Sequence, residues 1–150
     1  MYDINIETEL NSENVTKELF ERYLKAICEL LEVEGNFSYN VVSPERIRAL
    51  NKEYREIDDA TDVLTFRLDD DDSFPVFEEE EKEIGDIFMC IEKAQENCET
   101  FNVTLEEELL RLSLHGVMHL LGYDHKTNDF ATEPMLIKQE ELLLVLKQRI

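Results

Sequence analysis

Residues 115–125 read HGVMHLLGYDH and contain all three histidines of the chain, His115, His119 and His125. If this stretch begins as a helix, His115 and His119 are four positions apart and lie one turn above the other on a single face. Gly122 is the residue type that ends helices by adopting a left-handed conformation, so the chain can turn back there and bring His125 to the same point. The spacing therefore predicts one site built from three imidazoles.

Three neutral imidazoles with an open position are typical of catalytic zinc sites, whereas structural zinc sites normally close with four protein ligands, often cysteines. The sequence offers no such fourth ligand nearby, unless Asp124 bends in. Polar residues at a helix end, with one histidine satisfied in the core, are the alternative; that alternative suits a lone histidine better than three in one short stretch. We therefore predict one bound metal ion per chain, Zn²⁺ first, with Ni²⁺ or another late transition metal as alternatives.

The histidine spacing resembles the metzincin pattern H-E-x-x-H-x-x-G-x-x-H, except that Gly116 occupies the position of the catalytic glutamate. The complete string instead resembles the signature of the YbeY family of bacterial metal-dependent endoribonucleases. Two upstream stretches agree with that family in the same order: LNKEYR with TDVLTF at residues 50–55 and 61–66, and IGDIFM at residues 84–89. The resemblance therefore spans the chain from the first of these motifs to the last histidine.

The resemblance implies a single-strand-specific metal-dependent endoribonuclease that matures ribosomal RNA, notably the 3′ end of the small-subunit RNA, and acts in ribosome quality control. The partners that it implies are single-stranded RNA and the ribosome or a ribosomal protein, with no DNA and no membrane. One rival is a metalloprotease, which would lack its usual glutamate at position 116. A second rival is a ribosome-assembly factor that binds RNA or a ribosomal protein and uses its metal only for folding.

Two residues are candidates for catalysis beside the histidines. Arg55 ends the LNKEYR stretch, and its planar guanidinium matches a phosphate better than a lysine could. Its alternative is a surface arginine paired with Glu56 or Asp59. Asp124 precedes the last histidine and could hydrogen-bond a ligand ring to fix its tautomer, which we favour, or accept a proton from attacking water. Turn, cap or core roles explain the remaining polar motif residues equally well, so they are assigned no chemistry: Asn51, Tyr54, Thr61, Asp62 and Asp86.

Composition limits the class of protein. The chain has 150 residues, 43% of them hydrophobic, with four glycines and three prolines, which predicts a single domain over residues 1–150 with a genuine core. Its 15 basic and 36 acidic residues give a net charge of −21, the wrong sign for a protein that gains affinity by neutralising phosphates. This charge favours the assembly-factor rival somewhat, because an acidic protein suits a basic protein partner better than naked RNA.

Much of the acidity is concentrated in one segment. Residues 69–86 hold ten acidic residues against one lysine. We expect the acidic loop 69–83 to be a solvated, hairpin-like excursion, because runs of like charge repel one another. The alternative is that the loop repels duplex or misplaced RNA and confines binding to the metal site.

Cysteine usage and the N-terminus predict a cytoplasmic protein. Cys28, Cys90 and Cys98 are odd in number and form no C-x-x-C, which fits buried free thiols in a reducing compartment. No apolar run approaches the ~20 residues of a membrane span. The N-terminal MYDINIETEL has neither the basic nor the apolar region of a secretion signal.

Hydrophobic periodicity predicts an α+β domain of about four strands and five helices, with the helices packed on a small mixed sheet. We expect Asn11 or Ser12 to cap the first helix. The helix at 104–121 starts with a capping box at Thr104 and Glu107 and is apolar nearly all round, so it should be the buried spine with the metal site at its C-terminal end. The predicted strands are 2–7, 37–42, 63–68 and 84–91, and the predicted helices are 15–31, 44–55, 92–98, 104–121 and 132–148.

Overall fold

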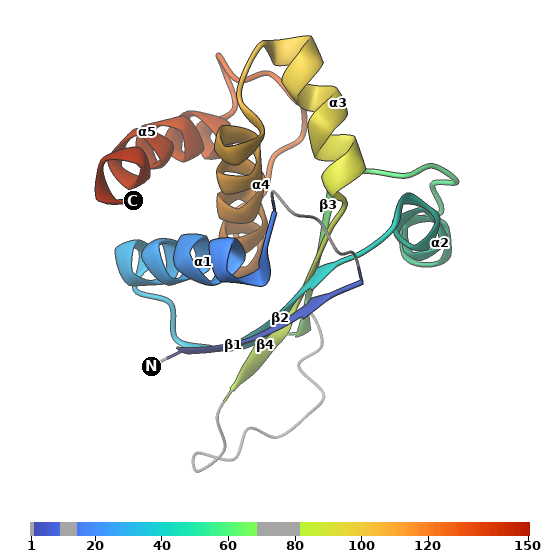
Figure 1. Ribbon diagram of the computed structural model, residues 1–150, viewed down its shortest axis with the longest axis horizontal. Coiled ribbons are helices and arrows are strands. Elements are labelled where there is room, and N and C mark those ends of the chain that lie inside the picture. The colour runs from blue at the N-terminus through green and yellow to red at the C-terminus, as the bar shows by residue number, and fades with distance from the viewer. Residues whose placement is uncertain (1, 10–14, 69–81) are drawn as a thin grey trace.

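The computed structural model describes residues 2–9, 15–68 and 82–150 (Figure 1). The strands within these ranges are β1 (Tyr2–Thr8), β2 (Gly35–Val41), β3 (Val63–Arg67) and β4 (Glu83–Met89). The helices are α1 (Lys17–Leu31), α2 (Pro44–Arg55), α3 (Ile91–Phe101), α4 (Leu105–Leu120) and α5 (Pro134–Arg149). The predicted α+β class, with four strands and five helices, is confirmed.

The strands form one mixed sheet in the order β1-β2-β4-β3. β1, β2 and β4 run parallel, and β3 pairs antiparallel with β4 at the edge. Parallel neighbours need a crossover connection, which α1 supplies between β1 and β2. In the β3–β4 pair Thr65 lies opposite Ile87, so the TDVLTF and IGDIFM stretches are side by side although they are far apart in the sequence.

α1 and α4 pack on one face of the sheet, and α3 and α5 pack in turn against α4 (Figure 1). α2 packs through Ile47 with a cluster that includes Leu64 and Phe88, whose side chains lie on the other face of the sheet. α4 is therefore enclosed by the sheet and three helices, which confirms it as the buried spine. The apolar side chains of α4 that are fully buried are Leu109, Leu114, Val117 and Met118.

A glycine allows α4 to approach the sheet closely. A Cβ atom on Gly116 would lie 3.1 Å from Cγ2 of Ile87 and 3.4 Å from the hydroxyl of Thr65. That hydroxyl donates a 3.3 Å hydrogen bond to the Gly116 carbonyl. The position that carries the glutamate in metzincins therefore faces the sheet here, where a larger side chain would force the packing apart.

Some boundaries differ from the predictions. Thr16 is the N-cap of α1, because its side chain accepts a 3.3 Å hydrogen bond from the backbone N–H of Leu19. The expected caps Asn11 and Ser12 lie outside the described residues, as does the acidic loop up to residue 81. The last predicted strand ends at Met89, since α3 begins two residues later and extends beyond the predicted helix.

The cysteines have the environments expected for free thiols. Cys28 and Cys90 are buried, and Cys98 is half-buried. Burial raises the pKa of the Cys28 thiol to about 12, so it stays protonated at neutral pH and is a poor metal ligand.

No helix of the described ranges has both the length and the apolar character that a membrane crossing requires.

Candidate metal centre and its cleft

α4 ends in a turn that reverses the chain. The backbone N–H of Gly122 donates to the carbonyl of His119, and that of Tyr123 donates to the carbonyl of Met118, both at 3.0 Å. This pair of bonds is the Schellman motif, and Gly122 takes the left-handed conformation that it requires, with φ of 99°. The turn brings His125 back beside the helix end, as the position of the glycine predicts.

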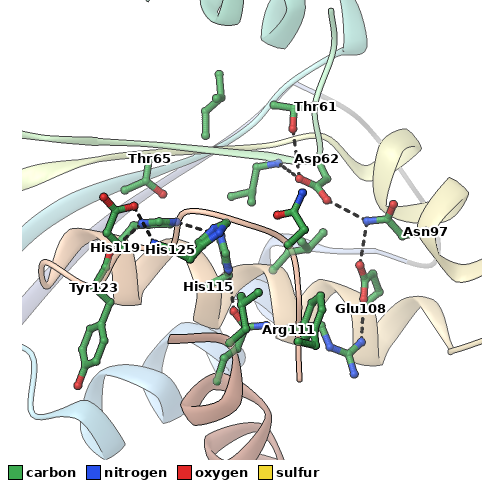
Figure 2. A pocket seen from close by; sticks show the side chains of 18 of the residues that line it. Thr61, Asp62, Thr65, Asn97, Glu108, Arg111, His115, His119, Tyr123 and His125 are labelled. Atoms are coloured by element: carbon green, nitrogen blue, oxygen red, sulfur yellow. Dashed lines mark hydrogen bonds and ion pairs between the residues drawn. The ribbon is translucent and has the colours of Figure 1, made fainter. Parts of the chain in front are cut away.

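The three histidines meet at this turn (Figure 2). One ligand atom from each lies within 4.8 Å of the other two. The Nε2 atoms of His115 and His119 are 3.0 Å apart. The ring of His125 is centred 5.2 Å from that of His115 and 5.4 Å from that of His119. The fold therefore brings together the residues of the predicted triad.

Hydrogen bonds at the opposite ring nitrogens set the tautomers. Each Nδ1 lies within hydrogen-bond distance of an amide oxygen, which accepts and cannot donate, so each Nδ1 carries the ring proton. All three Nε2 atoms are then left with a free lone pair. The pairs are His115 with Oε1 of Gln139 at 2.7 Å, His119 with the Tyr123 carbonyl at 2.9 Å, and His125 with the Thr127 carbonyl at 2.7 Å.

Burial keeps the two helical ligands neutral. The pKa of His119 is lowered to about 4, first by desolvation and then by the neighbouring His115. The pKa of His115 is also lowered, again chiefly by desolvation. At pH 7 two lone pairs therefore face each other at 3.0 Å, which is repulsive unless a cation lies between them. Two imidazole nitrogens on a tetrahedral zinc ion are ~3.3 Å apart, so these residues fit a metal ion.

The family model for Endoribonuclease YbeY matches residues 3–147. The chain belongs to the endoribonuclease YbeY family. Endoribonuclease YbeY of Sulfurihydrogenibium sp. (strain YO3AOP1) is 36% identical over 138 residues, which is 89% of this chain and 88% of the relative. Endoribonuclease YbeY of Clostridioides difficile (strain 630) is 38% identical over 146 residues, 94% of each chain. The solution structure of TM1509 from Thermotoga maritima aligns with a TM-score of 0.59 and 30% identity, over 98% of this chain and 91% of that one.

In this YbeY-family chain the triad lines a cleft of about 760 Å³. The cleft follows one face of α4 from Glu108 to His119. Arg55 lines it from the side of β3, donating a 2.7 Å hydrogen bond to the carbonyl of Thr65 and lying over the ring of Phe66, with Cζ 5.3 Å from the ring centroid. The edge strand therefore holds this guanidinium at the cleft, whereas the alternative placed it in a surface ion pair.

Asp124 also lines the cleft, but its contact differs from the expected one. Its carboxylate accepts a 2.9 Å hydrogen bond from the backbone N–H of His125, not from a ring. The Nδ1 atoms of the three histidines already have other hydrogen-bond partners, so Asp124 does not fix the tautomer of any of these rings. It shapes the turn that leads into the last ligand, and its carboxylate is exposed. The proton-accepting role stays a prediction.

Gln139 of α5 is a site residue that sequence reasoning missed. It is 1% exposed, and its amide nitrogen donates to Oε2 of Glu140 at 3.2 Å, which turns the amide oxygen toward His115. Arg111 holds Glu140 in place with bonds of 3.0 and 3.1 Å. The sequence does carry a signal for Gln139, because it is the one polar residue on the buried face of α5. The other residues of that face are Met135, Leu136, Leu143 and Leu146. The backbone carbonyl partners leave no such signal, because every residue has a carbonyl.

Asp62, which was assigned no chemistry, belongs to a polar network behind the histidines (Figure 2). The amide of Asn97 donates to Asp62 and to Glu108, at 2.9 Å in each case. Glu108 is 3% exposed and also accepts a 2.8 Å bond from Arg111. This network connects the start of β3, α3 and α4, and thereby fixes the wall of the cleft behind the metal centre.

The bond from Gln139 predicts an effect on metal affinity. Gln139→Met keeps the length of the side chain but removes the acceptor, so the His115 ring loses its fixed tautomer. We expect the dissociation constant for zinc to rise by roughly 10- to 100-fold, measured by competition with a chromophoric chelator. Leu143→Ala, which opens a cavity in the same helix without touching a ligand, is the control. Equal metal affinity in wild type and Gln139→Met would contradict this role.

The left-handed turn predicts a second effect without loss of a ligand. Gly122→Val puts a β-branched residue at φ of 99°, a conformation that costs an L-residue ~1 to 2 kcal/mol or more. We expect zinc affinity to fall by about tenfold or more, because the strain opposes the approach of His125. Gly122→Asn is the matched control, since asparagine tolerates this conformation. Wild-type affinity in the valine variant, measured by isothermal titration calorimetry, would show that the turn tolerates the side chain.

Proposed function

We propose that this YbeY-family chain is a metal-dependent endoribonuclease that cleaves single-stranded RNA, acting in maturation of the 3′ end of the small-subunit ribosomal RNA and in ribosome quality control. The observation that carries the proposal is the convergence of three histidine side chains in a cleft that a guanidinium also lines. Three imidazoles suit Zn²⁺, and Ni²⁺ or another late transition metal is the alternative. A metal ion held there would act as a Lewis acid on a phosphoryl oxygen and would lower the pKa of a water molecule to about 7.

The residues of the chain supply binding and orientation. Gln139 and the two backbone carbonyls hold the ligand rings in one tautomer, so the site is formed before RNA arrives. Arg55 offers N–H donors to the phosphate oxygens on which negative charge builds during cleavage. The hydrogen bond from Arg55 to the Thr65 carbonyl and the contact of its guanidinium with the Phe66 ring restrict its rotamers. Arg55 therefore loses less entropy when it binds phosphate. We propose Asp124 as the acceptor of a proton from the attacking water, because its exposed carboxylate lines the same cleft.

The proposed partners are single-stranded ribosomal RNA and the ribosome or a ribosomal protein, in the cytoplasm. The support for RNA is the endoribonuclease activity named for the curated relatives. The support for a ribosomal protein is the net charge of −21, which attracts basic surfaces. We expect neither DNA nor a membrane as a partner.

The two rival functions use the same histidines. A metalloprotease needs a general base, and position 116 is a glycine packed against Ile87 and Thr65. An assembly factor with a structural metal would bind RNA without cutting it. Membership of an endoribonuclease family favours cleavage over both rivals.

One experiment separates the three functions. Metal-loaded and chelated protein are each incubated with an unstructured RNA, a duplex RNA and an unstructured peptide. We expect cleavage of the unstructured RNA alone, and only by the loaded protein. Binding without cleavage would support the assembly factor, and cleavage of the peptide would support the protease.

A further inference from the structure

The net negative charge of the protein opposes the binding of RNA, so the source of its affinity for RNA needs an explanation. A net charge of −21 repels phosphates over long range, so binding gains little from the general field of the protein. The cleft itself does not reverse this balance, because its arginines are matched in number by carboxylates. The charged side chains that line it are Arg55, Arg67, Arg111, Asp62, Glu108 and Asp124. Away from the metal centre and Arg55, affinity for RNA must therefore come largely from contacts other than phosphate neutralisation.

Two large aromatic side chains line the same cleft in exposed positions. Phe101 is 62% exposed and Phe130 is 46% exposed. A single exposed phenylalanine is common on protein surfaces and needs no explanation. Among the phenylalanines of the described ranges, however, these two are the exposed ones, and both line the cleft that holds the histidines. They come from different segments, the end of α3 and the connection between His125 and α5.

The contacts of α3 place Phe101 at the end of the cleft that lies opposite the Gly122 turn. Asn97 lies one turn before Phe101 on the same helix face, and it donates to Glu108 at 2.9 Å. Glu108 precedes His115 by seven residues, or about 10 Å along α4. In Figure 2, Asn97 and Glu108 lie on one side of the pocket and Tyr123 on the other, with the histidines between them. A stacked strand advances ~3.4 Å per nucleotide, so this end lies roughly three nucleotides from a phosphate at the metal centre.

We infer that Phe101 and Phe130 form a stacking subsite for unpaired nucleobases of the RNA substrate, an inference that rests on the proposed function. Every base has a face that stacks on a phenyl ring, so such a subsite holds RNA without regard to sequence and without a cationic surface. The bases of a duplex are already paired and stacked and cannot be splayed onto the ring. The subsite therefore selects single-stranded RNA in a protein whose charge opposes RNA binding.

The test combines side-chain removal with base removal. Full-length metal-loaded wild type, Phe101→Ala and Phe130→Ala are compared under single-turnover conditions on a short unstructured RNA, and on copies with one abasic nucleotide moved through the positions around the cut. Leu144→Ala is the control, because Leu144 is 64% exposed on α5 and does not line the cleft. Both the half-saturating RNA concentration and the maximal rate are measured, with metal content checked for each variant.

We expect each phenylalanine variant to raise the half-saturating concentration by roughly 5- to 150-fold, the range for loss of one stacked base, with the maximal rate and metal content near wild type. An abasic nucleotide at the matching position should weaken binding to wild type by a similar factor and have little further effect on the variant. The subsite would be overturned if both variants kept the wild-type half-saturating concentration, or if the losses from side-chain removal and from base removal were fully additive. In either case cleavage by wild type would leave the proposed function standing. No cleavage by wild type at all would contradict the proposed function, and the subsite with it.

Discussion

Replacing His119 with alanine is expected to remove the metal from the protein and to lower RNA cleavage by on the order of a thousandfold, because a catalytic metal contributes several kcal/mol of transition-state stabilisation. His119 is one of the two histidines on α4, with its Nε2 atom 3.0 Å from that of His115 and its ring centred 5.4 Å from that of His125. The remaining pair would bind metal only weakly. Elemental analysis of protein purified without a histidine tag, together with a cleavage assay, measures both losses.

The control for this variant is Lys126→Ala, which removes an exposed charge next to His125 but no ligand. It should keep its metal and its activity. Chelation of the wild-type protein should reproduce the loss of cleavage, and added zinc should restore it in wild type but not in His119→Ala. Full metal occupancy in His119→Ala would contradict the proposed triad.

Arg55→Ala is expected to lower the single-turnover cleavage rate by about 10²- to 10³-fold, with metal content and thermal stability close to wild type. The reason is that a fixed donor aimed at developing charge contributes mainly in the transition state. Arg55→Lys should recover part of the rate at most, because an ammonium group cannot form the bidentate pair of a guanidinium. The rates are compared at matched metal occupancy on a short unstructured RNA.

Arg48→Ala is the matched control, because Arg48 is an exposed arginine of the same helix that pairs with Asp58 at 2.9 Å and does not line the cleft. Water screens an exposed pair of this kind, so it contributes little to stability, and its loss should leave cleavage unchanged. Wild-type rates in Arg55→Ala would return Arg55 to a surface role and leave the metal as the sole assigned catalytic element.

In this YbeY-family chain the candidate metal centre is built at one helix end. α4 supplies two of its histidines from its last turns, and the segment after the glycine turn supplies the third within a few residues. The surrounding helices then fix the orientation of the His115 ring and the wall of the cleft behind it. α5 orients the His115 ring through Gln139, and α3 holds the wall behind it through Asn97.

Local features of the sequence determined the strands, the helices and the clustering of the three histidines. The cluster was predictable because two of the histidines lie four residues apart on one helix and the third follows a glycine, so no long-range contact is needed to relate them. The buried spine was predictable for a similar reason, since α4 is apolar around nearly its whole circumference. The cap of α1 was not predicted correctly, because several residues before the helix can accept the same backbone bond and Thr16 is the one that does so.

Only the tertiary structure decided which side chains complete the site. Gln139 meets His115 across 24 residues of sequence, and Thr65 meets Gly116 across 51, so neither pair follows from periodicity. The same applies to Arg55, which is held at the cleft by a strand carbonyl ten residues away. For Asp124 the local motif was misleading. Its position suggested a hydrogen bond to a histidine ring, but the rings have other partners and Asp124 accepts from the backbone N–H of His125 instead. Secondary structure follows from local spacing, whereas a hydrogen-bond partner depends on which surfaces pack together, and that is a property of the whole chain.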